Sequence, residues 1–484
     1  MPGVRGPVCS LRQGDSRFAL LDRSADRAGK RRWDRVRLML LIVIDCLRAD
    51  HVSAYGYGRE TTPTIDRLAS RGVLWEQAFS TSSWTKPSVT SLLTGLYPTQ
   101  HGAFVGIKRD RAQGRVTTDV LRSATPTLAE ALSRAGWRCA AFINNAQLGT
   151  FTNLNRGFEV YRTGAGRADR IIESLKDWWS SDADRPAFAY LHFLEAHWPY
   201  KPRRRHVRAF GGDRDTNRYR DFRARDYARL RRAVSRREKT LSEEELADMI
   251  MMYDGAVRRL DGKIKSILSW LKDVGLEDET TLIVTADHGE EFLEHGKLGH
   301  GQSVHVELTH VPLVMTGPDV PAGRRMAAPV SLADVPRTLL SRVADPSDLP
   351  GADLLDGDRP RPAFSEQRIR LRYMHSLRDA RWSYLRTFRF DIEGDVLDDR
   401  RTAWEWVRDL PHERRERLFD RQADPRERHD LAGEAAYASV RDEREAVLDD
   451  WWAGIARETV TVPEEDVVLD PRVVQHLRDL GYLE

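Results

Sequence analysis

Two apolar runs, at residues 38–44 and 281–285, show no alternation of hydrophobic and polar positions. Their sequences are LMLLIVI and TLIVT, and branched side chains dominate both of them. Continuous runs of this kind are typical of strands that are covered on both faces, as in a parallel sheet. We therefore predict that both runs are buried strands of one sheet.

Helical and strand-like patterns alternate along most of the chain. Helical spacing of apolar residues is found at 62–72, 126–136, 243–271 and 436–456, and strand-like runs are found at 73–79, 139–143, 187–194 and 382–388. Strands that are separated by helices predict a mostly parallel sheet. The expected fold is therefore α/β, with a central sheet that is flanked by helices on both faces.

Changes in composition suggest how the chain is divided. Residues 1–35 are rich in Arg, Asp and Gly, and we expect them to form a disordered leader. Residues 36–359 would form the α/β domain, and residues 360–484 a smaller α+β region packed on it. A dense Arg run at 201–240 has two interpretations, a solvated surface insertion or a basic lid over an anionic substrate.

The overall composition is that of an ordinary globular protein, with 484 residues, 40% hydrophobic and 31% charged. A net charge of +3 is small for this length and gives no indication of nucleic-acid binding. Since no apolar run reaches the about 20 residues that cross a bilayer, no membrane anchor is expected. Cys9, Cys46 and Cys139 form no CxxC pair, which suits a reducing compartment and predicts a cytoplasmic location.

Metal-ligating side chains follow both buried runs directly. Asp45 comes after the first run, and Asp287 and His288 come after the second. Parallel strands bind ligands at their carboxyl ends, so the three side chains could converge on one divalent cation. Any one of them alone is better explained as a helix cap, but the three together favour a metal site.

Thr85 is the candidate nucleophile. Pro87 fits the first turn of a helix that ends at Gly95, which puts Thr85 just ahead of a helix N-terminus. Unpaired N–H groups there would face an anion, and a bound cation would help the hydroxyl to lose its proton. Taken alone, Thr85 fits better as a helix cap, and the neighbouring metal site is what favours the catalytic role.

A series of motifs resembles the sulfatase family of the alkaline phosphatase superfamily. In chain order they are IDCLRADH at 44–51, YGY at 55–57, TTPTIDRLA at 61–69, LTGLYPTQHG at 93–102, HWPY at 197–200, ADHGE at 286–290, LGHG at 298–301, VPL at 311–313, LFD at 418–420, DP at 424–425 and LGYL at 480–483. The resemblance spans residue 36 to the C-terminus. It implies an alkaline phosphatase-like fold and a hydrolase.

The resemblance also implies a role for each matching position. The implied metal ligands are Asp45, Thr85, Asp287 and His288, and Thr85 would also be the nucleophile. His197 and His300 resemble the family's substrate-side groups, which hold anionic oxygens or protonate the leaving group. A packed interior histidine is an equally good explanation of His197 alone. Glu195 is a weaker candidate for a further metal ligand.

Two departures from the family pattern affect the expected chemistry. Sulfatases convert a Cys or Ser to formylglycine within a Cys/Ser-x-Pro-x-Arg signature, and the corresponding run at 85–89 is TKPSV. A β-branched alcohol cannot yield that aldehyde, and Val89 cannot supply the guanidinium that supports it. The family's Lys-x-His element corresponds to Asn144-Asn145-Ala146, so two cationic sulfate contacts are absent. Sulfate-ester hydrolysis by the aldehyde-hydrate route is therefore disfavoured.

A Thr nucleophile beside a metal resembles the phosphate-handling members of the superfamily, which include phosphodiesterases, phosphonate hydrolases and phosphotransferases. We predict a hydrolase or transferase of phosphate or phosphonate esters, with Lys86, Asn144 and Asn145 neutralising substrate oxygens. One divalent ion is expected, and Mn²⁺, Mg²⁺, Ca²⁺ and Zn²⁺ all suit the donors. Two alternatives stay open: a conventional sulfatase, and an idle protein that binds a sulfated or phosphorylated polymer.

Overall fold

The structure, a computed structural model, describes residues 35–457 and 464–466, except for 105, 107, 110–115, 165, 358–359, 370 and 392–402. The leader predicted at 1–35 therefore lies outside the described residues, apart from its last position. The motif at 480–483 lies outside them as well. Among the described residues, no helix combines the length and apolar character needed to cross a membrane.

A sheet of eight strands forms the centre of the molecule, in the order β14-β2-β13-β9-β1-β8-β6-β7. Its strands are β1 (Leu38–Ile44), β2 (Val73–Trp75), β6 (Arg138–Ile143), β7 (Val160–Thr163), β8 (Ala187–Phe193), β9 (Thr280–Thr285), β13 (Leu313–Thr316) and β14 (Arg324–Met326). The five central strands from β9 to β7 run parallel, and β13 is antiparallel to both of its neighbours. Every residue of β1, β8 and β9 is buried, as their continuous apolar sequences predict.

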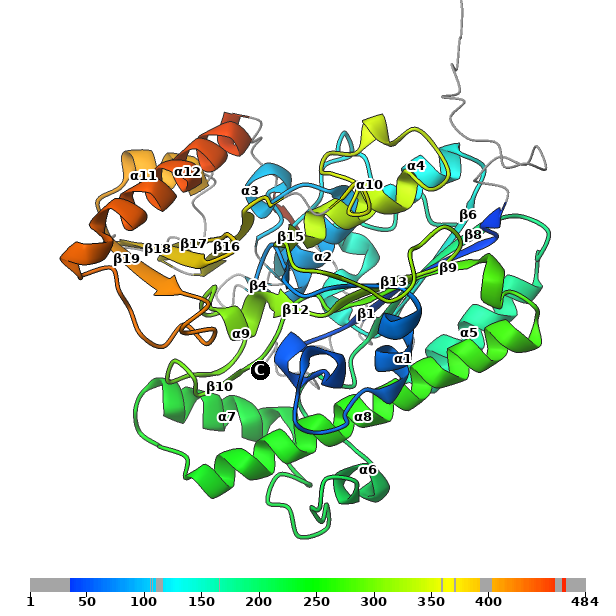
Figure 1. Ribbon diagram of the computed structural model, residues 1–484, viewed down its shortest axis with the longest axis horizontal. Coiled ribbons are helices and arrows are strands. Elements are labelled where there is room, and N and C mark those ends of the chain that lie inside the picture. The colour runs from blue at the N-terminus through cyan, green and yellow to red at the C-terminus, as the bar shows by residue number, and fades with distance from the viewer. Residues whose placement is uncertain are drawn as a thin grey trace, which may run out of the picture.

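Helices cover both faces of this sheet (Figure 1). On one face lie α2 (Thr85–Thr94), α4 (Leu128–Arg134) and α10 (Val335–Leu340), and on the other lie α1 (Pro63–Arg71), α5 (Ala168–Ser180) and α8 (Glu243–Asp273). Both α4 and α8 begin with a capping box, in which Thr127 pairs with Glu130 and Ser242 with Glu245. The predicted α/β architecture with helices on both faces is confirmed.

One strand prediction was wrong in detail. The run at 73–79 forms two strands, β2 and β3 (Ala78–Phe79), because β3 leaves the central sheet and joins a smaller one in the order β12-β3-β15. The partners of β3 are β12 (His310–Val311) and β15 (Val330–Ser331). The remaining short elements are α3 (Pro98–His101), α9 (Val306–Thr309), β4 (Lys108–Arg109), β5 (Val116–Asp119), β10 (Glu291–Phe292), β11 (Leu298–Gly299) and β20 (Glu464–Asp466).

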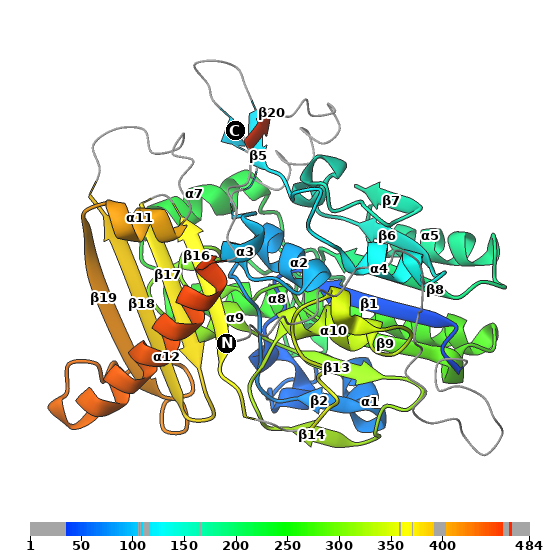
Figure 2. The ribbon, with the colours of Figure 1, turned by 90° about the horizontal axis from the view of Figure 1, so that it is seen from above.

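The C-terminal region is a four-stranded antiparallel sheet with helices on it, as the α+β prediction states. Its strands are β16 (Ala363–Ile369), β17 (Arg372–Arg378), β18 (Trp382–Phe390) and β19 (His412–Asp420). Its helices are α11 (Ala403–Asp409) and α12 (Ala438–Arg457), and Figure 2 shows α12 lying across the sheet. Small apolar clusters fill the space beneath α12, and Trp452 and Leu448 are buried in them.

A buried carboxylate joins this region to the α/β domain. Glu427 accepts hydrogen bonds from the Arg378 guanidinium at 2.9 and 3.2 Å and from the Val306 backbone N–H at 3.0 Å, and its side chain is fully buried. Although burial opposes its charge, Arg378 and then His305 hold the pKa of Glu427 well below its ordinary value. A carboxyl group with a depressed pKa stabilises the fold above its unfolded pKa, and this contribution is lost as the pH falls.

We expect the Glu427→Gln variant to lose about 3–5 kcal/mol in the free energy of unfolding at pH 7, because Arg378 is left as a buried unpaired charge. The loss should shrink in acid, where protonation of the wild-type carboxyl group removes the same interaction. Urea unfolding at pH 7 and in acid measures both effects. The exposed Glu434→Gln variant is the control, and an equal loss in both variants would contradict the prediction.

Candidate active site

The carboxyl ends of three parallel strands bring the predicted site together. Asp45 follows β1, Asp287 and His288 follow β9, and Asn145 follows β6. Strands β1 and β9 pair in parallel with Val43 opposite Thr285, so their last residues end at the same level. Thr85 is not at a strand end. It is the first residue of α2, whereas the sequence predicted it just ahead of this helix. Residues separated by about half of the chain therefore meet at one place.

The four predicted metal ligands lie close to one another. The Thr85 Oγ1 atom lies 3.4 Å from Asp45 Oδ2 and 3.3 Å from His288 Nε2. The His288 Nε2 atom lies 3.7 Å from Asp45 Oδ1 and 3.5 Å from Asp287 Oδ2. These separations are long for hydrogen bonds. Two ligand atoms that each lie about 2.0–2.5 Å from a shared cation are about 3–3.7 Å from each other, and the observed separations fall in this range.

The charge of the site also suits a cation. Asp45 and Asp287 are both fully buried, and the Oδ2 atom of Asp287 has no hydrogen-bond partner. Burial and the nearby Asp45 raise the pKa of Asp287 well above its ordinary value. Burial also disfavours the charge of Asp45, but a hydrogen bond from His192 and the nearby His197 and His288 keep its pKa low. A divalent cation would balance this buried negative charge and occupy the free side of Asp287.

His192 belongs to the site although the sequence analysis did not identify it. Its Nε2 atom lies 3.1 Å from Asp45 Oδ2, and its Nδ1 atom lies 2.8 Å from the Tyr190 hydroxyl. His192 therefore orients Asp45, as partners of metal ligands commonly do. The only sequence signal was a histidine inside a strand that is otherwise apolar and aromatic.

Cys46 is a second residue that sequence reasoning passed over. It has a left-handed backbone (φ 63°), and its N–H donates to Asp287 Oδ1 at 3.3 Å. Its Sγ atom lies 3.1 Å from Asp45 Oδ1 and 3.5 Å from His300 Nδ1. The strained backbone thus places both the N–H and the thiol of Cys46 against the metal ligands.

The three predicted substrate-binding residues have different partners: Thr85 and Asp45, a neighbouring cavity, or β5. The Asn145 amide donates to Asp45 Oδ2 at 2.7 Å and to Thr85 Oγ1 at 3.3 Å, so it reaches the nucleophile. Asn144 helps to line a neighbouring cavity. The buried ammonium of Lys86 donates to the Thr118 hydroxyl at 2.6 Å and to the Asp119 carbonyl, both in β5.

His197 and His300 lie side by side at the site, with ring centroids 5.2 Å apart. The His300 Nδ1 atom is 3.1 Å from Glu290 Oε1, and its ring is 4.5 Å from that of His288. Burial and the neighbouring imidazoles lower the pKa of His300 far below its ordinary value, so the ring is neutral in the free protein. Glu195 has a different role, because it accepts the Ala168 N–H at 2.8 Å and caps α5.

The Arg-rich insertion packs against the histidine loops. It contains α6 (Arg204–Arg208) and α7 (Ala224–Ser235). From α7, Arg231 donates to the His300 carbonyl at 3.1 Å, and the Tyr227 ring stacks on Trp198 with centroids 4.2 Å apart. The insertion therefore covers the segments that hold His197 and His300.

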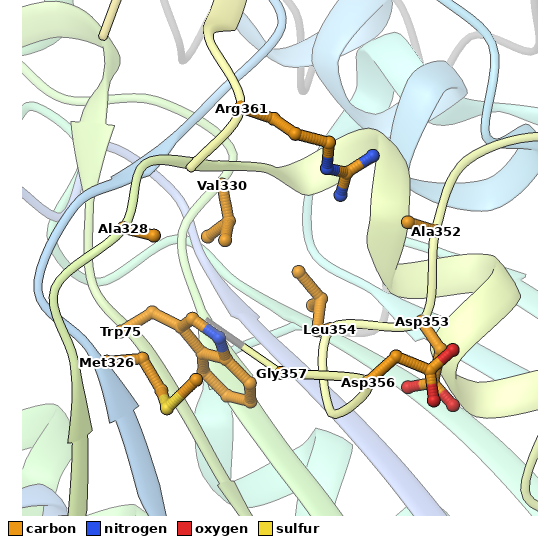
Figure 3. A pocket seen from close by; sticks show the side chains of 10 residues that line it. All are labelled: Trp75, Met326, Ala328, Val330, Ala352, Asp353, Leu354, Asp356, Gly357 and Arg361. Atoms are coloured by element: carbon orange, nitrogen blue, oxygen red, sulfur yellow. The ribbon is translucent and has the colours of Figure 1, made fainter. Parts of the chain in front are cut away.

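A larger cavity, of about 340 Å³, lies elsewhere (Figure 3). In Figure 3, Trp75 and Met326 line one side, and Asp353 and Asp356 line the other. None of the predicted site residues borders this cavity. The candidate active site is therefore the cluster of predicted ligands and not this cavity.

Comparison with known protein families agrees with a metal-dependent hydrolase. The sequence model described as Sulfatase matches residues 37–344, well over half of the chain. The chain belongs to the sulfatase family. It is thus a hydrolase of a family that uses a divalent metal, and the ligand geometry around Asp45 and Asp287 fits such an ion.

Two sulfatases match this chain over most of their own length, and a solved hydrolase structure shares its fold. An ulvan-active sulfatase of Formosa agariphila is 22% identical over 490 residues, which cover 90% of this chain and 77% of the relative. The N-sulphoglucosamine sulphohydrolase of Homo sapiens is 25% identical over 448 residues, with coverage of 82% and 86%. The crystal structure of the phosphonate monoester hydrolase of Agrobacterium radiobacter shares the fold, with a TM-score of 0.65, 22% identity and coverage of 90% and 98%.

Proposed function

We propose that this sulfatase-family enzyme hydrolyses phosphate or phosphonate esters, or transfers their phosphoryl or phosphonyl group, with Thr85 as the nucleophile. The position of the Thr85 hydroxyl, within 3.4 Å of both Asp45 and His288, carries this proposal. The first turn of α2 begins at the same residue, so its N–H groups and helix dipole favour a bound anion beside Thr85.

The residues around Thr85 support phosphoryl chemistry over the formylglycine route. Thr85 cannot be converted to the aldehyde, and Val89, at the position of the supporting guanidinium, is fully buried in the apolar core. Asn144 stands where the family's lysine would, and the next residue, Asn145, donates a neutral amide N–H to Thr85. Phosphoryl transfer needs positioning and charge neutralisation more than covalent chemistry from the protein, and these residues offer both.

Each residue has a defined task in the proposed reaction. A divalent cation, when bound, would favour the ionised Thr85 hydroxyl and neutralise substrate oxygens. Thr85 Oγ1 attacks phosphorus while Asn145 holds the hydroxyl and Asp45 in register. The bond to the ester oxygen breaks, and the departing alcohol takes a proton from His300 or His197. Water or an acceptor alcohol then attacks phosphorus, which breaks the bond to Thr85 Oγ1 and restores the hydroxyl. Because an anionic ester stabilises a protonated imidazole, substrate binding itself would raise the pKa of His300.

Sulfate-ester hydrolysis is the competing function, and the sulfatases among the relatives favour it. An idle anion-binding role is a third possibility, but a binding protein does not need four converging metal ligands. Metal analysis of the purified protein separates the idle role from the other two, because an idle fold would retain no stoichiometric divalent ion.

A substrate panel tests the proposal. The panel contains 4-nitrophenyl phosphate, bis(4-nitrophenyl) phosphate, 4-nitrophenyl phenylphosphonate and 4-nitrophenyl sulfate, each assayed with Mn²⁺, Mg²⁺, Ca²⁺ and Zn²⁺. We expect at least one phosphorus ester to exceed the sulfate ester about 100-fold in kcat/KM, or about 2.7 kcal/mol. A preference for the sulfate ester with every metal would overturn the phosphorus assignment.

A further inference from the structure

We propose that a small basic cavity beside His197 is a subsite for a second anionic group, so that the preferred substrates are esters that also carry a carboxylate or another oxyanion. This inference rests on the proposed function only in taking the ester to react at Thr85. It names a substrate class that neither the family nor the ligand geometry specifies.

The cavity adjoins the reacting groups. It has a volume of about 130 Å³, and the residues that matter here are Asn144, Arg167, Glu195, His197, Lys201 and Arg259. A ring nitrogen of His197 lies within 4.8 Å of donor atoms of both Asp45 and Cys46. Asn144 is the chain neighbour of Asn145, which bonds to Thr85. His197 thus borders both the cavity and the predicted active site.

Positive charge dominates the cavity wall. Three of its residues are cationic, and Glu195 is the acidic one, with one of its oxygens used to cap α5. The Lys201 ammonium is held by the carbonyls of Arg220 and Phe222 at 3.1 and 3.0 Å. The three cations exceed the single carboxylate, so an anion that enters meets a net attraction.

Arg259 is the best placed of these cations. One guanidinium nitrogen donates to the Lys201 carbonyl at 2.8 Å, which fixes the side chain, while its buried Nε atom has no hydrogen-bond partner. Burial lowers the pKa of Arg259; the nearby Glu195 carboxylate opposes this shift, and Arg167 and Arg203 add to it. A buried guanidinium donor without a partner costs free energy that a bound oxyanion would recover.

The size of the cavity suits a small anionic group. At about 30 Å³ for each water, the volume corresponds to about four waters. A carboxylate, phosphate or sulfate group fits this space. The second anionic group should therefore sit on a short arm.

Calorimetric binding to the metal-loaded full chain tests the subsite without relying on turnover. The probes are methylphosphonate and 3-phosphonopropionate, which differ by a carboxylate on a short arm. We expect the carboxylated probe to bind about tenfold more tightly to the wild type, as a charge-assisted hydrogen bond provides. This advantage should fall below about threefold in Arg259→Met, while the affinity for methylphosphonate stays unchanged.

Arg258 offers a matched control on the same helix. Its guanidinium pairs with Glu60 at 3.1 Å on another side of α8, so Arg258→Met should keep the full carboxylate advantage. The exposed Arg167→Met variant provides a second loss of cavity charge, in case Arg259→Met does not fold. An advantage that survives both cavity substitutions would overturn the subsite.

A parallel pair of sulfonates, methanesulfonate and 3-sulfopropionate, separates the two proposals. If only the sulfonates bind and their carboxylate advantage depends on Arg259, then the phosphorus assignment fails and the subsite stands. If phosphonates bind without a carboxylate advantage, the subsite fails and the assignment stands. Absence of the advantage in both series overturns the subsite.

Discussion

The Thr85→Ala variant should lose turnover by on the order of 10⁴-fold while it keeps its fold and its metal, since removal of a nucleophile typically has an effect of this size. The remaining ligands, Asp45, Asp287 and His288, still hold the ion, because Thr85 is the weakest donor among them. Turnover of the best substrate in the panel, with metal content by mass spectrometry, measures both quantities.

Two variants make this result specific. Thr90 is buried in the same helix, but its hydroxyl bonds to the Lys86 carbonyl at 2.8 Å, so Thr90→Ala should retain most of the activity. Thr85→Ser preserves the hydroxyl and should restore a substantial part of turnover. Equal activity in Thr85→Ala and wild type would remove Thr85 from the mechanism.

The second large effect is expected in the Asp287→Asn variant, where metal binding and catalysis should fail together. Loss of one charged ligand should lower kcat/KM by at least about 10³-fold, since the cation contributes several kcal/mol to the transition state. Thermal unfolding gives a separate signature. The wild type should gain a few degrees in Tm when saturated with metal, whereas the variant should gain none.

The effect of Asp287→Asn on the unfolding temperature should reverse its sign when metal is removed. Burial and the nearby Asp45 raise the pKa of Asp287, so its negative charge destabilises the metal-free fold near neutral pH. In EDTA, Asp287→Asn should therefore unfold at a higher temperature than the wild type. Asp261→Asn is the control: Asp261 is buried and caps α1 through the Thr64 and Ile65 N–H groups, so this variant should keep the metal-induced gain. A metal-induced gain in Asp287→Asn would contradict the assignment.

The sequence predicted the parts of the fold that depend on local pattern. The runs at 38–44 and 281–285 became β1 and β9 because short, unbroken apolar runs rich in branched side chains favour strands buried on both faces. The break between β2 and β3 was not predictable, because it depends on which sheet each half joins. Local sequence carries no information on such long-range pairing.

In the site, too, residues marked by local pattern were predicted, and residues that depend on long-range pairing were missed. Asp45, Asp287 and His288 were found because they directly follow predicted strands, and the structure brings them together. His192 was missed because its role depends on β8 lying beside β1, a neighbour relation that the sequence does not state. Glu195 was considered as a ligand from its spacing to His197, but the chain turns between them and directs Glu195 to the start of α5. Neighbouring positions in sequence thus gave less guidance than strand ends did.

The central place of β1 in the sheet affects how the enzyme becomes active during synthesis. Strand β1 is made early and pairs with β8 and β9, and β9 ends only at Thr285. A nascent chain that stops before β9 contains Asp45 and Thr85 but lacks Asp287 and His288. Capture of the proposed cation would therefore wait until β9 has joined β1, although β13, β14 and the C-terminal region are made later.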